Sequence, residues 1–143
     1  MDYFSLKGGI IHAEDVPLPA IAAAVGSPVY VYSRATLERH AQVFKAALAP
    51  IARTHVAFAI KANPNLSVLR VLANQGFGAD VVSGGEIARA LAAGMRPQDV
   101  VFSGVGKTRD EIERSLSDSI GHFNIELEED GFALSEIAGG LGK

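Results

Sequence analysis

Short apolar runs recur through the second half of the chain, and each is followed by a segment whose apolar residues have helical spacing. The runs begin at Val56, Ala79, Val100 and His122, so their spacing is nearly constant. Nearly continuous apolar strands, separated by one helix each, are typical of a parallel sheet covered by helices. The pattern therefore predicts four consecutive βα units.

The segments between the runs support this prediction with helix faces and helix ends. Apolar residues at helical spacing occur in each segment: Leu66, Leu69 and Leu72, then Ile87 and Leu91, then Ile112 and Leu116. Residues 83–86 and 108–111 both have the form of a capping box, and Gly76 and Gly94 follow expected helix ends. Four such units make half of a (β/α)8 barrel. Residues 134–143 predict a last helix with a glycine stop, and we expect the other half of the barrel to lie outside these residues.

The first part of the chain has a different pattern. An apolar pair at Ile10 and Ile11 precedes a short predicted helix that ends at Gly26. Residues 29–32 are rich in β-formers, and Ser33 is placed to cap a helix that ends before Pro50. We therefore divide the chain into an N-terminal segment, residues 1–33, and the first half of an α/β barrel, residues 34–143.

Composition excludes several classes of function. The 143 residues are 48% hydrophobic and 20% charged, as expected for a globular domain, with a net charge of −3. The basic residues form no stripe that could neutralise a nucleic-acid backbone. The start lacks the pattern of a signal peptide and no run could span a bilayer, so we expect a cytoplasmic protein without nucleic-acid or membrane partners. Cysteine is absent and the four histidines are far apart, so we expect no metal site.

Lys61 is the first candidate for chemistry because it directly follows the most apolar run, residues 56–60. In barrels of this type, active sites lie at the carboxyl ends of the strands. A lysine beside an apolar interior loses its charge more readily than one in water, which frees its amine to react with an aldehyde. Position alone nevertheless favours the simpler role of a lysine that reaches for solvent.

Asp80 is the second candidate, and it lies within the next apolar run. Consecutive units usually place their strands side by side, so Asp80 is expected near Lys61. A carboxylate in such a run needs a charged or hydrogen-bonding partner. Two roles remain open: an ion pair that fixes strand register, and a counter-charge for the Lys61 amine when substrate displaces it.

Two further residues near strand ends are weaker candidates for a functional role. Residues 106–108, Gly-Lys-Thr, suggest a P-loop, but the spacing would need glycine where Val101 stands inside a strand. Lys107 is therefore left as a cation that could face the site. His122 begins its strand and so lies at the end of the barrel away from the chemistry, where a packing or solvent-facing role is expected.

Two motifs together resemble a known family. Residues 58–63, Phe-Ala-Ile-Lys-Ala-Asn, resemble the cofactor-lysine motif of the alanine-racemase-like pyridoxal-phosphate-dependent decarboxylases. Residues 78–86, Gly-Ala-Asp-Val-Val-Ser-Gly-Gly-Glu, are similar to the segment that these enzymes carry one unit later. Residues 26–33, 102–108 and 123–126 resemble diaminopimelate decarboxylases in particular, although a serine commonly follows the glutamate where Leu127 stands.

The resemblance implies a cofactor, a reaction and roles for both candidates. Pyridoxal 5'-phosphate would form an imine with Lys61, and Asp80 would be the acidic residue beside it. The full enzyme would decarboxylate meso-diaminopimelate to lysine, in lysine biosynthesis, as a homodimer. The segments that hold the phosphate and the pyridine nitrogen lie further along the family's sequence, with a C-terminal β-domain, so we expect this chain to be inactive alone.

Three alternatives remain open within and outside this family. An ornithine or arginine decarboxylase is the nearest alternative for the substrate. A homologue without catalytic activity that binds a full-length subunit is another, and a pyridoxal-phosphate-binding protein with a single barrel is the third. The roles of Lys107, Glu126 and His122 also remain open.

Overall fold

The computed structural model describes residues 2–143, and the chain separates into two compact units, Met1–Pro50 and Ile51–Lys143. The N-terminal unit begins with an antiparallel sheet of three strands in the order β1-β2-β3. The strands are β1 (Phe4–Lys7), β2 (Ile10–Ala13) and β3 (Val16–Pro17). Gly8 and Gly9 connect β1 to β2 with φ angles of 57° and 80°, which glycine adopts without strain. The sequence pattern did not predict this sheet.

Two helices complete the N-terminal unit, and both end where the sequence predicts. Helix α1 (Leu18–Val25) stops at Gly26, and helix α2 (Arg34–Leu48) ends before Pro50. The Ser33 hydroxyl accepts a hydrogen bond from the backbone N–H of Thr36, as expected for an N-cap. Residues 29–32 join no strand, because β-forming side chains do not make a strand where the backbone has no ladder partner.

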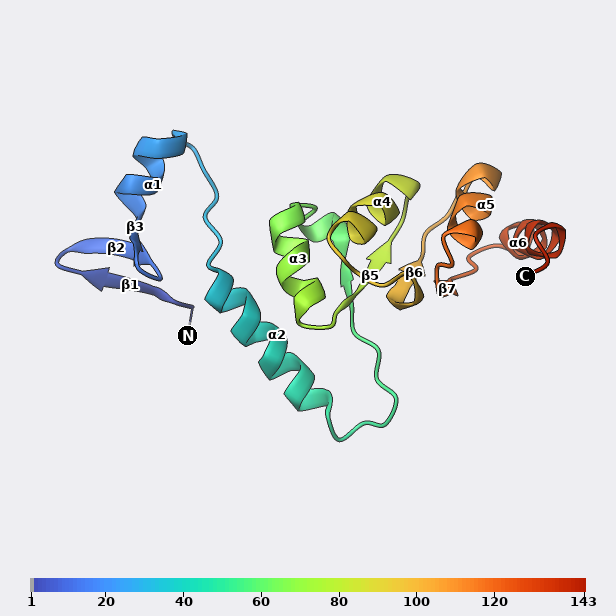
Figure 1. Cartoon of the computed structure of the whole chain (residues 1–143), viewed down its shortest axis with the longest axis horizontal. Helices are drawn as coiled ribbons and strands as arrows, with labels where there is room; N and C mark the ends of the chain where they lie inside the picture. The colour runs from blue at the N-terminus through green and yellow to red at the C-terminus, as the bar shows by residue number, and fades with distance from the viewer. Residues whose placement is uncertain (1) are drawn as a thin grey trace. The chain divides into compact units, whose positions relative to one another are not determined.

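The second unit contains a parallel sheet of four strands in the order β4-β5-β6-β7. Its strands are β4 (Ala57–Ala59), β5 (Gly78–Val81), β6 (Val100–Phe102) and β7 (His122–Phe123). The helices that follow them are α3 (Leu66–Asn74), α4 (Gly84–Ala92), α5 (Arg109–Ser117) and α6 (Glu128–Gly140). Short 3-10 turns η1 (Ile60–Ala62) and η2 (Pro97–Asp99) follow β4 and precede β6. The α/β class and the four βα units are thus confirmed (Figure 1).

The core of this unit lies between the sheet and its helices. Ile60, Leu69, Val81, Val100 and Phe102 are completely shielded from solvent. Helix contacts run in chain order, from α3 to α4, α4 to α5 and α5 to α6, which agrees with the arrangement in Figure 1. This packing fixes the strand ends at which the candidate residues lie.

The caps of the second unit differ in detail from the predicted pair of capping boxes. Thr108 and Glu111 form a complete capping box at α5. Ser83 caps α4 through the Glu86 N–H, but the Glu86 carboxylate accepts instead from the Val82 N–H. The last helix begins six residues earlier than the predicted segment, at Glu128 rather than Leu134.

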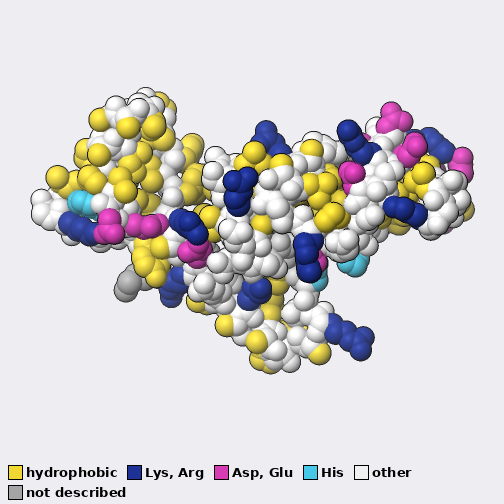
Figure 2. All heavy atoms as spheres, viewed as in Figure 1, with side chains coloured by type: hydrophobic (Ala, Val, Ile, Leu, Met, Phe, Trp, Pro, Cys, Tyr) yellow, Lys and Arg dark blue, Asp and Glu magenta, His cyan; other side chains and the backbone are white. Residues whose placement is uncertain are grey.

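The surfaces of the two units differ in character. In the N-terminal unit, hydrophobic side chains gather over α1 and the small sheet (Figure 2), and Leu6 and Val25 are more than 65% exposed. Acidic and basic side chains intersperse over α5 and α6, where Arg109 pairs with Glu136 at 2.8 Å. Within residues 2–143, no helix combines the length and the apolar character needed to cross a bilayer.

Candidate active site

The carboxyl ends of β5, β6 and β7 carry a row of three hydrogen-bonded polar side chains. The Ser103 hydroxyl donates to Asp80 Oδ1 at 2.6 Å, and Asn124 Nδ2 donates to Ser103 Oγ at 2.9 Å. Asp80 lies inside β5, whereas Ser103 and Asn124 directly follow β6 and β7. Asp80 thus has the polar partner that its apolar surroundings require. Sequence reasoning missed Ser103 and Asn124, although each stands immediately after an apolar run.

Lys61 lies at the carboxyl end of β4, in the turn η1. Its neighbour Ile60 is buried completely, while Lys61 itself is exposed. Among the residues that the structure describes, the Lys61 side chain makes no hydrogen bond or ion pair. Its amine is therefore open to a molecule that arrives from solvent.

The strand register brings the backbones of Lys61 and Asp80 close without pairing the side chains. Ala59, two residues before Lys61, lies opposite Asp80 in the β4–β5 ladder. No ion pair within 4.0 Å joins the two side chains, and the Asp80 carboxylate instead accepts from Ser103. Asp80 Oδ2 has no hydrogen-bond partner in the described chain, so half of this carboxylate remains available.

Lys107 occupies a different environment from Lys61, although both follow strands. Its side chain is only 2% exposed, and Nζ donates to the carbonyl oxygens of Gly104 and Asn124 at 2.6 and 2.8 Å. Asp130 Oδ2 lies 3.9 Å away, close enough for an ion pair but too far for a hydrogen bond. Lys107 therefore joins the loop after β6 to the loop after β7, and its burial leaves it inaccessible to an aldehyde.

The structure also shows the contacts of Glu126 and His122, the other two residues whose roles the sequence left open. Glu126 Oε1 accepts from the backbone N–H of Gly104 at 3.2 Å, which adds a second tie between the same two loops. His122 opens β7 and lies 5.9 Å from the ring of His55, whose Nε2 contacts the carbonyl oxygen of Asp99 at 3.0 Å. His122 thus begins β7 and His55 precedes β4, so both histidines lie at the amino ends of the strands, at the opposite end of the sheet from Lys61.

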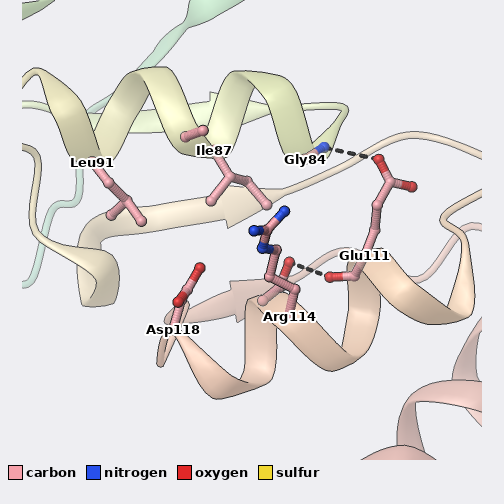
Figure 3. Close-up of a pocket in the computed structure, with 8 residues that line it drawn as sticks. Gly84, Ile87, Leu91, Glu111, Arg114 and Asp118 are labelled. Atoms are coloured by element: carbon pink, nitrogen blue, oxygen red, sulfur yellow. Dashed lines mark hydrogen bonds between the residues drawn. The ribbon is translucent and has the colours of Figure 1, made fainter.

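A groove of about 350 Å³ lies in the helix layer between α4 and α5, well outside the row of strand ends. Figure 3 shows Ile87 and Leu91 on one wall and Arg114 and Asp118 on the other. Glu111 bridges the two helices, and the hydrogen bond from the Gly84 N–H is the main reason that the pKa of Glu111 lies below its ordinary value. We regard this groove as a consequence of helix packing, because no strand-end residue lines it.

Comparison with known proteins identifies the family to which this chain belongs. The family model described as "Pyridoxal-dependent decarboxylase, pyridoxal binding domain" matches residues 34–138. The chain belongs to this family of pyridoxal-dependent decarboxylases, as the motifs around Lys61 and Asp80 indicate.

Individual relatives show which kind of decarboxylase the chain is similar to. The chain is 51% identical to the diaminopimelate decarboxylase of Zymomonas mobilis over 98% of its own length, and 49% identical to that of Vibrio cholerae over 99%. A crystal structure of the M. jannaschii diaminopimelate decarboxylase with L-lysine superposes with a TM-score of 0.87 at 32% identity, over 98% of this chain and 33% of that one. The chain spans about a third of the length of the curated relatives, 34% in both cases.

The family implies pyridoxal phosphate as cofactor, and the residues present fit its aldehyde end. Reaction with an aldehyde needs a primary amine that is accessible and unpaired. Of the two lysines that follow strands, Lys61 has both properties and Lys107 has neither. The free oxygen of Asp80 provides a carboxylate near the same strand edge. The chemistry of the donor set therefore agrees with the family.

Proposed function

We propose that Lys61 is the cofactor-binding lysine of a pyridoxal-phosphate-dependent diaminopimelate decarboxylase, which converts meso-diaminopimelate to lysine, and that Asp80 is its acidic partner. The observation that carries this proposal is the contrast between Lys61 and Lys107. Both follow strands of one sheet, but only the Lys61 amine is exposed and without a partner in residues 2–143. The division into an N-terminal segment, residues 1–33, and a barrel segment, residues 34–143, is part of the same proposal.

Lys61 and Asp80 would have different roles in the proposed reaction. Lys61 would hold the cofactor through its side-chain amine, at the strand end where barrel enzymes place their chemistry. Asp80 would offer its second oxygen as a counter-charge to the Lys61 amine once the substrate has displaced that amine from the cofactor. The cofactor, when bound, supplies the electron sink that loss of carbon dioxide requires. For the chain by itself, the proposed activity is capture of the cofactor at Lys61.

The choice of substrate rests on the relatives. Those that match with 49–51% identity over nearly the whole chain are diaminopimelate decarboxylases. This favours meso-diaminopimelate over ornithine or arginine, the alternatives that the motifs leave open. A cytoplasmic enzyme that acts as a homodimer is part of the same proposal and is supported by the family resemblance.

Cofactor capture tests the proposal directly. The chain is mixed with pyridoxal phosphate, its visible spectrum is recorded, the adduct is reduced with borohydride, and labelled lysines are located by peptide mass mapping. We expect the label to concentrate on Lys61. Lys61→Ala should lose the absorbance change, and Lys45→Ala, which replaces an exposed lysine on α2, should retain it. Labelling spread evenly over the lysines, or unchanged total labelling in Lys61→Ala, would contradict the assignment.

A further inference from the structure

Asp80 has two potential partners at the strand ends, and only one of them is engaged. Its Oδ1 accepts the Ser103 hydroxyl at 2.6 Å, whereas Lys61 lies beyond 4.0 Å and pairs with none of the described residues. A carboxylate and a lysine amine on neighbouring strand ends attract each other, which favours a rotation of the Asp80 side chain toward Lys61. The hydrogen bond to Ser103 therefore competes with that ion pair.

The row of side chains fixes the direction in which Ser103 donates. An ionised carboxylate only accepts hydrogen bonds, and the amide nitrogen of Asn124 only donates them. With Asn124 Nδ2 at 2.9 Å, the Ser103 oxygen accepts on that side and directs its single proton to Asp80. Asn124 thus orients the hydroxyl that holds Asp80.

The backbone anchors both members of this row. The Ser103 N–H donates to the carbonyl oxygen of Val81 at 2.8 Å, and the Asn124 N–H donates to that of Phe102 at 2.9 Å. The Asn124 carbonyl oxygen also accepts from the buried Lys107. Ser103 and Asn124 consequently have little freedom to follow Asp80 if its side chain turns away.

We propose that Ser103 is a positioning residue that holds the Asp80 carboxylate away from Lys61, so that the lysine amine stays unpaired and reactive before the cofactor arrives. Lysine reacts with aldehydes as the neutral amine, and an ion pair with Asp80 would stabilise the charged form instead. This inference rests on the proposed function only in taking Lys61 as the amine that captures the cofactor.

Competitive labelling with acetic anhydride tests the inference without the cofactor. The chain is labelled across a pH series, and the pH at which Lys61 is half-labelled is compared in wild type, Ser103→Ala and Ser103→Thr. We expect Ser103→Ala to raise this pH by about half a unit, the size that an exposed ion pair supports, and to slow labelling at neutral pH about threefold. Ser103→Thr keeps a hydroxyl and should restore the wild-type value.

The Asp80→Asn variant distinguishes a positioning role of Ser103 from a general disturbance of the structure by Ser103→Ala. Asp80→Asn removes the charge that would pair with Lys61, so adding Ser103→Ala to Asp80→Asn should leave the half-labelling pH unchanged. An unchanged value in Ser103→Ala alone would overturn the inference, as would a shift that persists in the Asp80→Asn background. Lys143, remote in sequence from the row, provides an internal reference in every sample.

The same variants distinguish this inference from the proposed function. If Lys61 shows the expected shift with acetic anhydride but no preference for pyridoxal phosphate, the positioning role stands and the cofactor assignment fails. If Lys61 captures pyridoxal phosphate at the same rate in wild type and Ser103→Ala, with the same half-labelling pH, the assignment stands and the positioning role fails.

Discussion

Glu111 Oε1 accepts a hydrogen bond from the backbone N–H of Gly84 at 2.8 Å, so the residue that completes the capping box of α5 also satisfies the first turn of α4. Its other oxygen accepts from the Thr108 N–H at 3.1 Å. One carboxylate therefore serves two helix N-termini, where unpaired N–H groups and the helix dipole both favour negative charge. It links consecutive βα units on the helix side of the sheet.

Replacing Glu111 should weaken both helix starts at once. We expect Glu111→Gln to lower the free energy of unfolding by about 1–2 kcal/mol, since capping bonds to a charged acceptor are lost or weakened. Urea denaturation followed by circular dichroism measures the change. Glu113→Gln is the matched control on α5, because that exposed side chain makes no hydrogen bond or ion pair in the described chain, and its stability should stay within about 0.5 kcal/mol of wild type. Equal losses in both variants would contradict the bridging role.

The contribution of Glu111 should also depend on pH. The Gly84 N–H and then the Thr108 N–H lower the pKa of Glu111 from its ordinary value of 4.5. A carboxyl group whose pKa is lower in the folded state stabilises the fold fully above its unfolded pKa, and this contribution disappears as pH falls through the folded pKa. The stability difference between wild type and Glu111→Gln should therefore be constant near neutral pH and shrink below about pH 4.5. A difference that stays constant down to pH 3 would show that the charge of Glu111 contributes nothing.

Lys107 should be important for stability. Lys107→Met removes two hydrogen bonds to carbonyl oxygens and leaves Asp130 buried without its cation. We expect a loss of about 3 kcal/mol, because an uncompensated buried charge is expensive. Chemical denaturation should show partial recovery when Asp130→Asn is added.

The matched control for Lys107 is Arg109→Met. Arg109 pairs with Glu136 at 2.8 Å, but both side chains are more than half exposed. Water and salt screen such a pair, so the loss of stability should be much smaller than that of Lys107→Met. A cost for Lys107→Met as small as that of Arg109→Met would contradict the role of Lys107 as the tie between the two loops.

Gly78 at the start of β5 should tolerate no side chain. An added Cβ would overlap the carbonyl oxygen of Asp99 and approach His55 Cε1 within 2.8 Å. We expect Gly78→Ala to cost about 2 kcal/mol or more, since backbone must move to make room. Gly85→Ala is the control, because its Cβ would meet nothing closer than Ser83 Oγ at 3.9 Å, and alanine stabilises a helix relative to glycine. Thermal unfolding should therefore move in opposite directions for the two variants.

Local signals in the sequence determined most of the second unit. Four apolar runs at nearly constant spacing predicted β4 to β7, and the helix caps at Ser83 and Thr108 are where residue type placed them. Such features depend on neighbours a few residues away, so periodicity and capping chemistry are sufficient to predict them. The motifs around Lys61 and Asp80 likewise predicted the family, which the comparisons confirm.

The partners of the charged side chains were decided by the tertiary structure alone. Lys61 and Lys107 both follow apolar runs, yet one amine is exposed and the other is buried against carbonyl oxygens 3 and 17 residues away. Asp80 takes its hydrogen bond from Ser103, 23 residues along the chain, and not from the lysine that the motif suggests. Which of several polar groups meets a given side chain depends on strand register and on the loops beyond each strand, and these arise only when the sheet assembles.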